Sequence, residues 1–111
     1  MDTLDTYRQY IEQLMTDRAS RVWDQRVMAQ TIFDRERDHY QLVHVGWFGS
    51  SKRIYGVVLH VDIIDGKIWV QQDGTETGIA VELHELGVPK DQIVLGFDPP
   101  LTRHMTGFAP G

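Results

Sequence analysis

An Asp-Gly pair at positions 65 and 66 separates two segments in which apolar and polar residues alternate. Asp65-Gly66 is a strong hairpin signal, because a type I′ turn requires positive φ at both of its central positions. With these two residues as the loop, Ile64 lies opposite Lys67, and this fixes the register of the flanking strands. The chain is therefore expected to contain an antiparallel sheet with two faces of different character.

The two-residue loop assigns every side chain of this hairpin to one face, since successive side chains of a strand alternate. The predicted core face is apolar and comprises Tyr55, Val57, Leu59, Val61, Ile63, Ile68 and Val70. On the opposite face, Asp62 is predicted to lie across from Trp69, and His60 across from Gln71.

The remaining segments predict an α+β fold. A helix is expected from Thr3 to Ala19, capped by Asp2 or Thr3, because its apolar residues recur at helical spacing. A short second helix is expected from Thr75 to Leu86. Strands are expected at residues 27–33, 39–48, 53–64, 67–73 and 92–97. The predicted architecture is an N-terminal helix packed on an antiparallel β-sheet of about five strands, with the short second helix before the last strand.

The loop near Gly49 to Lys52 extends the face that carries His60 and Asp62. If Phe48 pairs with Arg53, Gln41 lies beside His60, and the face contains His39, Gln41, Val43, Trp47, Ile54, Val58, His60, Asp62, Trp69 and Gln71. In the same register His39 lies beside Asp62, and Trp47 lies beside Ile54. Large apolar groups next to hydrogen-bonding groups are typical of association surfaces.

The tail from Pro99 to Gly111 is rich in Pro and Gly and is expected to be extended. Arg103, His104 and Phe108 in this tail are expected to dock either on their own domain or on a partner. The predicted partner or oligomer contacts are Trp47, Ile54, His60, Asp62, Trp69, Gln71, Arg103 and Phe108.

No residue pattern in the sequence indicates a particular chemical reaction. The chain contains no cysteine, which excludes disulfides and cysteine zinc sites. His39, His60 and Asp62 could form a two-histidine, one-carboxylate metal site, but no ligand motif supports it, and cross-strand hydrogen bonding is the preferred interpretation. No catalytic residue, metal or cofactor is therefore expected, and the protein is not expected to be an enzyme.

Size and charge narrow the functional classes further. The 111 residues fit one domain, expected to span 1–111, and the net charge of −5 argues against strong direct nucleic-acid binding. No apolar run approaches the ~20 residues that cross a bilayer, and the N-terminus is not a signal peptide. A cytoplasmic protein without a membrane partner is expected.

Four stretches carry a resemblance to a known family: TIFDRERDHYQLVHVGW, RIYG, HVDIIDGKIWVQQDGTE and LGVPKDQIVLGFDPPLTRHMTGFA. They follow one another in a single order over nearly the whole chain, which is more specific than a short motif. On these residues the chain resembles the XisI-like proteins, described as controlling factors for excision of the fdxN element, a DNA rearrangement in cyanobacteria. Residues 20–28 and the tip at 48–52 depart from the family pattern.

The resemblance implies a role in excision of a DNA element by a separate recombinase. It also implies an XisH-like partner that resembles nucleases in fold. The resemblance assigns no catalytic residues to this chain. We therefore expect a non-enzymatic accessory or regulatory protein that contacts an XisH-like protein and itself as a homo-oligomer. Two alternatives stay open: a subunit that contributes to a shared active site of a nuclease or recombination complex, and an antitoxin-like neutraliser of a nuclease partner.

Overall fold

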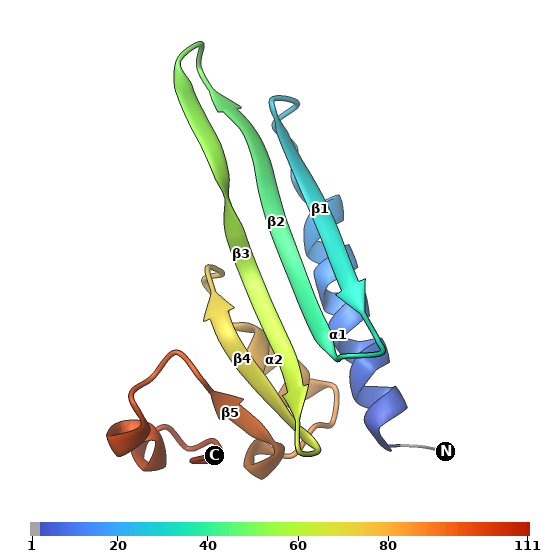
Figure 1. Cartoon of the computed structure of the whole chain (residues 1–111), viewed down its shortest axis with the longest axis vertical. Helices are drawn as coiled ribbons and strands as arrows, with labels where there is room; N and C mark the ends of the chain where they lie inside the picture. Colours follow the sequence, from blue (N-terminus) through green and yellow to red (C-terminus); the bar gives the residue numbers. More distant parts are fainter. Residues whose placement is uncertain (1–2) are drawn as a thin grey trace.

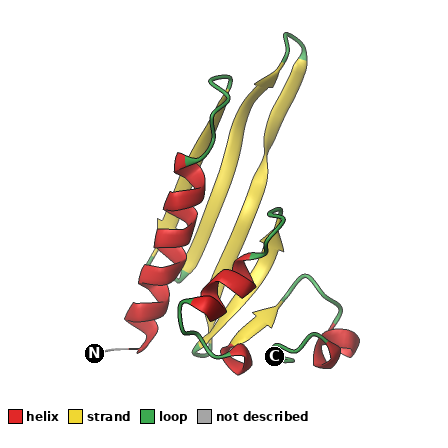
Figure 2. Ribbon diagram, turned by 180° about the vertical axis from the view of Figure 1, so that it is seen from behind, coloured by secondary structure: helices red, strands yellow, loops and turns green. Residues whose placement is uncertain are grey.

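The two α-helices cover one face of a five-stranded sheet (Figures 1 and 2). The structure is a computed structural model that describes residues 3–111, so the predicted cap Asp2 lies outside the described residues. In chain order the elements are α1 (Thr3–Ser20), β1 (Val27–Asp34), β2 (His39–Phe48), β3 (Lys52–Ile64), β4 (Lys67–Asp73), α2 (Ile79–Glu85), η1 (Lys90–Gln92), β5 (Ile93–Leu95) and η2 (Pro100–Met105).

The strands lie in the sheet in their sequence order, and β1 to β4 pair antiparallel. β5 pairs parallel to β4, because α2 carries the chain back before the last strand begins. The predicted α+β class, with its N-terminal helix and its short helix before the last strand, is confirmed, but the sheet is mixed and not purely antiparallel as expected. No helix in the described part of the chain has the length and apolar character needed to cross a membrane.

The core lies between the helices and the sheet. Tyr7, Ile11 and Met15 recur every four residues along α1, so they form one buried stripe. This stripe packs with buried residues from the sheet and α2, namely Tyr40, Leu42, Leu59, Val61, Ile63, Ile68, Val70, Ile79, Ala80, Leu83, Val88 and Ile93. The helix-covered face of the sheet is thus the core face.

A β-bulge in β3 changes which side chains belong to the core face. Leu42 pairs with Leu59, whereas Val43 pairs with Val57, so Val58 is an extra residue in β3. The prediction that Tyr55 and Val57 share the core face with Leu59 is therefore wrong: their side chains are 74% and 39% exposed. Val58, predicted on the other face, packs instead against the core.

The tip of the β2–β3 hairpin is one residue shorter than predicted. Phe48 pairs with Lys52 and Trp47 with Arg53, not Phe48 with Arg53 and Trp47 with Ile54. The bulge adds one residue, Val58, to β3. The pairs from Leu42–Leu59 to His39–Asp62 therefore keep the predicted register. The predicted pairs His39–Asp62 and Gln41–His60 are consequently confirmed.

A second bulge lies in β4. Asp62 pairs with Trp69, as the Asp-Gly loop predicted, and Asp65 and Gly66 have positive φ of 51° and 79°. His60 pairs with Gln72 and not with Gln71, because Gln71 is an extra residue between two paired positions. The predicted His60–Gln71 pair is therefore wrong.

The second helix begins later than predicted. It starts at Ile79 instead of Thr75, because Gly78 adopts a φ of 89° that breaks helical geometry. The carboxylate of Asp73 accepts the backbone N–H of Ile79 at 2.8 Å and that of Thr75 at 2.9 Å. Thr75 therefore belongs to the loop that leads into α2 and does not cap it.

The tail docks on its own domain and is not fully extended. Residues Pro100–Met105 form a 3-10 helix, which corrects the prediction of an extended tail. Beyond it, the N–H of Ala109 donates to the carbonyl of Ile93 at 2.8 Å, and the ammonium of Lys67 donates to the carbonyl of Gly111 at 2.6 Å. The tail therefore lies beside β5 and β4.

Candidate functional site

The face of the sheet away from α1 and α2, here called the open face, carries two groups of side chains. The first is the imidazole–carboxylate cluster, which consists of His39, His60 and Asp62. Nδ1 of His39 lies 2.8 Å from Oδ1 of Asp62, and Nε2 of His60 lies 2.9 Å from the same oxygen. The sequence predicted that these three residues would be neighbours, and the structure brings them together.

Strand pairing positions the cluster. His39 faces Asp62 directly across β2 and β3, and His60 lies two residues before Asp62 on the same face. The bulged Gln71 approaches from β4, and its amide donates to Oδ2 of Asp62 at 3.3 Å. Three strands thus converge on one carboxylate.

The carboxylate is shielded, but the imidazoles reach the surface. The side chain of Asp62 is 10% exposed, compared with 30% for His60 and 55% for His39. A hollow on the open face is lined by the cluster together with Ile32, Asp34 and Gln41. The nitrogen and oxygen atoms of the cluster therefore lie within reach of solvent and of dissolved cations.

The second group, here called the aromatic–arginine patch, consists of Trp47, Arg53 and Tyr55. The guanidinium of Arg53 lies 5.2 Å from the ring centroid of Trp47 and 5.9 Å from that of Tyr55. Trp47 is 46% exposed even with the arginine against it. This group lies on the part of the β2–β3 hairpin that extends beyond α1 (Figure 1).

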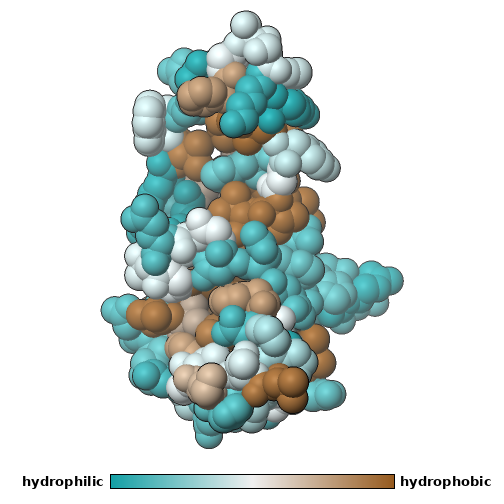
Figure 3. Space-filling model, turned by 90° about the vertical axis from the view of Figure 1, so that its left-hand side faces the viewer, coloured by the Kyte–Doolittle hydropathy of each residue, from teal (hydrophilic) through white to brown (hydrophobic). Residues whose placement is uncertain are grey.

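Further apolar side chains on β1 continue this surface. Met28 pairs with Val45 and Ile32 with Gln41, which places both on the open face, and they are 58% and 51% exposed. Figure 3 views the molecule from the β3 side and shows hydrophobic side chains at the surface among hydrophilic ones. The open face thus combines polar, cationic and apolar groups.

Sequence reasoning missed Arg53 and Tyr55 because it carried a strict alternation through the bulge. A signal was present: Val57 and Val58 are two adjacent apolar residues after Gly56, a pattern that breaks the alternation. The predicted contact Ile54 pairs with Gly46 and therefore points to the face opposite Trp47.

The predicted contacts Trp69, Arg103 and Phe108 are engaged within the chain. The guanidinium of Arg103 lies 5.2 Å from the Trp69 ring centroid, and it donates to the carbonyls of Asp98 at 3.0 Å and Gly96 at 3.2 Å. Phe108 packs against the core, and the ammonium of Lys90 lies 5.8 Å from its ring centroid. These three residues position the tail.

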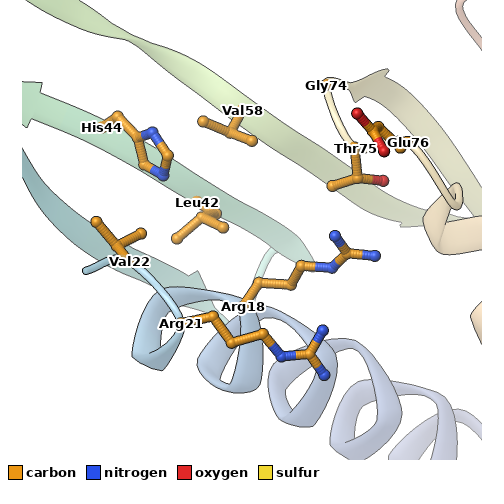
Figure 4. Close-up of a pocket in the computed structure, with 9 residues that line it drawn as sticks. All are labelled: Arg18, Arg21, Val22, Leu42, His44, Val58, Gly74, Thr75 and Glu76. Atoms are coloured by element: carbon orange, nitrogen blue, oxygen red, sulfur yellow. The ribbon is translucent and has the colours of Figure 1, made fainter. Parts of the chain in front are cut away.

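A second hollow lies on the helix side, between the end of α1 and strands β2 and β3 (Figure 4). Arg18, Arg21 and His44 line it, which is a composition that could attract an anion. Arg18 already pairs with Glu82, and Arg21 with Asp17, so both guanidinium charges are compensated within the chain. The open face is the stronger candidate.

The family model of the XisI protein matches residues 1–110. The chain belongs to the XisI protein family. No curated protein sequence matches it. The crystal structure of an XisI-like protein from Anabaena variabilis is similar, with 46% sequence identity, a TM-score of 0.89, and coverage of 96% of this chain and 98% of that one.

A second solved structure extends the similarity. The fdxN element excision controlling factor XisI from Anabaena variabilis is 33% identical, with a TM-score of 0.83, and the match covers 99% of this chain and 100% of that protein. The family expected from the sequence is confirmed.

Proposed function

We propose that this XisI family member is a non-enzymatic accessory factor in excision of a DNA element. It acts by binding other proteins, namely an XisH-like protein and a second copy of itself. Family membership and the similarity to an excision controlling factor support the biological process. The open face supports protein binding as the mode of action.

The observation that carries this proposal is the exposed aromatic–arginine patch. Trp, Tyr and Arg are the residue types most enriched among side chains that contribute strongly to protein–protein binding. Here one residue of each type forms a stacked group on a protruding hairpin, with Tyr55 74% exposed. Exposed apolar residues on β1 widen the same surface.

The charge balance favours a protein partner over direct DNA recognition. The chain has 11 Lys and Arg against 16 Asp and Glu, whereas phosphate neutralisation needs an excess of cations on one surface. Arg8, Arg18, Arg26 and Arg35 each pair with a carboxylate of the chain itself. The guanidinium of Arg53 on the open face lies over the rings of Trp47 and Tyr55.

A co-purification experiment tests the partner contact. An XisH-like protein is tagged and incubated with the untagged chain, either unchanged or carrying Trp47→Ser and Tyr55→Ser. We expect binding to weaken roughly ten-fold or more, because the double substitution removes two large contact groups.

The matched control is Trp23→Ser, since Trp23 is 88% exposed and lies in the connection between α1 and β1. Binding of this variant should equal that of the parent chain. Equal binding of the parent and the Trp47/Tyr55 variant would exclude the aromatic–arginine patch as the contact. A nuclease activity of the isolated chain would exclude the non-enzymatic role.

A further inference from the structure

We propose that His39, His60 and Asp62 form a binding site for a divalent transition-metal cation of the zinc type. The ligand atoms of these three residues all lie within 4.8 Å of one another. Cross-strand hydrogen bonding accounts for the distances when no cation is bound. The charge, geometry and support of the cluster favour a second, metal-bound state.

The charge of Asp62 is the first argument. Asp38 and Glu82 are also largely shielded, and each faces the guanidinium of an arginine. The side chain of Asp62 is only 10% exposed, and it faces two imidazoles and the amide of Gln71. A shielded carboxylate is stable when a cation compensates its charge, and a divalent metal bound between the imidazoles would do so.

The arrangement of ligand atoms is the second argument. One nitrogen of each imidazole approaches the same oxygen of Asp62, at 2.8 and 2.9 Å. In a tetrahedral zinc site with bonds of about 2 Å, neighbouring ligand atoms lie about 3.3 Å apart. Small rotations of the exposed His39 and the half-exposed His60 that lengthen these two nitrogen–oxygen distances by about half an ångström would therefore bring them to this spacing.

The support around the cluster is the third argument. Oδ2 of Asp62 is held by the Gln71 amide, which leaves Oδ1 directed at the imidazoles. Metal-binding carboxylates are commonly oriented by such a hydrogen bond to their other oxygen. Gln71 is the extra residue of the β4 bulge, and its amide reaches Asp62 from that position.

The donor set also selects the class of ion. Two imidazoles and one carboxylate suit Zn²⁺, Co²⁺ and Ni²⁺, whereas Mg²⁺ and Ca²⁺ prefer oxygen ligands alone. Three protein ligands next to a solvent-reaching hollow leave a coordination position for water or another small ligand. Such a site differs from the closed four-ligand sites that only stabilise a fold.

Metal titration of the untagged full chain, after treatment with a chelator, tests this proposal. Calorimetry with Zn²⁺ should show about one ion per chain, and Co²⁺ should give the visible absorption bands of a four-coordinate site. Replacing a ligand, as in His39→Gln or His60→Gln, should weaken binding by at least ~100-fold, while Gln71→Leu should weaken it about ten-fold.

His104→Gln is the matched control, because it removes an imidazole from η2 outside the cluster. Circular dichroism confirms that each variant folds, and His39→Gln changes a side chain that is 55% exposed, so its fold is expected to persist. No binding by the parent chain, or equal binding by the His39 and His104 variants, would overturn the proposal. This outcome is independent of whether the XisH-like protein binds the aromatic–arginine patch.

Discussion

Tyr40 lies where the first helix meets the turn between β1 and β2. Its ring is fully buried, and its hydroxyl donates to Oδ1 of Asp38 at 2.8 Å. Asp38 also accepts Nε of Arg8 at 2.8 Å, and this guanidinium lowers the pKa of the Asp38 carboxyl below its ordinary value. Burial raises the pKa of Tyr40, so its hydroxyl stays protonated as a donor. These three residues attach α1 to the sheet.

Replacing Tyr40 by phenylalanine isolates the contribution of that hydroxyl. The substitution leaves the buried ring in place and removes one hydrogen bond to Asp38, so we expect a loss of about 1 kcal/mol in unfolding free energy. Tyr55→Phe is the matched control, because the same atom is removed from a ring that is 74% exposed. Urea denaturation, monitored by circular dichroism, gives the unfolding free energy of both variants. Similar losses in the two variants would contradict the assigned role of Tyr40.

At the scale of elements, the two bulges account for the side chains that sequence reasoning placed wrongly. The Asp65-Gly66 loop fixed the pairs from Val61–Val70 to Ile64–Lys67, because local turn chemistry determines hairpin register. The adjacent Val57 and Val58 break the alternation, but which of them is the extra residue depends on packing within the folded sheet, which the sequence pattern does not specify. Tyr55 was therefore assigned to the core although it lies on the open face.

Gly46 of β2 allows the chain before β1 to approach the sheet closely. A Cβ atom at this position would lie 2.1 Å from the carbonyl oxygen of Arg26 and 2.8 Å from the Cα of Val27. Both are backbone atoms, so the start of β1 would have to move. The N–H of Trp47 donates to that Arg26 carbonyl at 3.1 Å, and this hydrogen bond would be strained as well.

We therefore expect Gly46→Ala to lower the unfolding free energy by about 2 kcal/mol, in the range of overpacked interiors. Gly56→Ala is the control on the paired strand, because a Cβ there meets no atom within 4 Å. It should be neutral or slightly stabilising, since alanine restricts the unfolded chain. Thermal melts of the two variants compare them directly. A midpoint for Gly46→Ala equal to that of Gly56→Ala would show that β1 adapts without cost.

At the scale of the whole molecule, the candidate site was predicted in part. His39, His60 and Asp62 were correctly placed together because the register error at the tip and the bulge at Val58 compensate each other. The tail was harder to predict: whether Arg103 would stack on its own Trp69 or on a partner depends on three-dimensional packing that the sequence pattern does not specify. Trp69 is thus unsuited to serve as a free contact, and Tyr55 joins the predicted contact Trp47 as a residue to test.

Self-association through the open face is the remaining consequence of this architecture. The hairpin of β2 and β3 extends past α1, so two copies could cover each other's aromatic–arginine patch by pairing around a two-fold axis (Figure 1). The scattering mass of the parent chain should then exceed the 12.8 kDa of one copy. Changing Trp47 and Tyr55 to serine should return it to that of a monomer. Leu101→Ser, at an 88% exposed position on η2, should leave the mass unchanged. A parent chain that stays monomeric at every protein concentration measured would contradict self-association through this face.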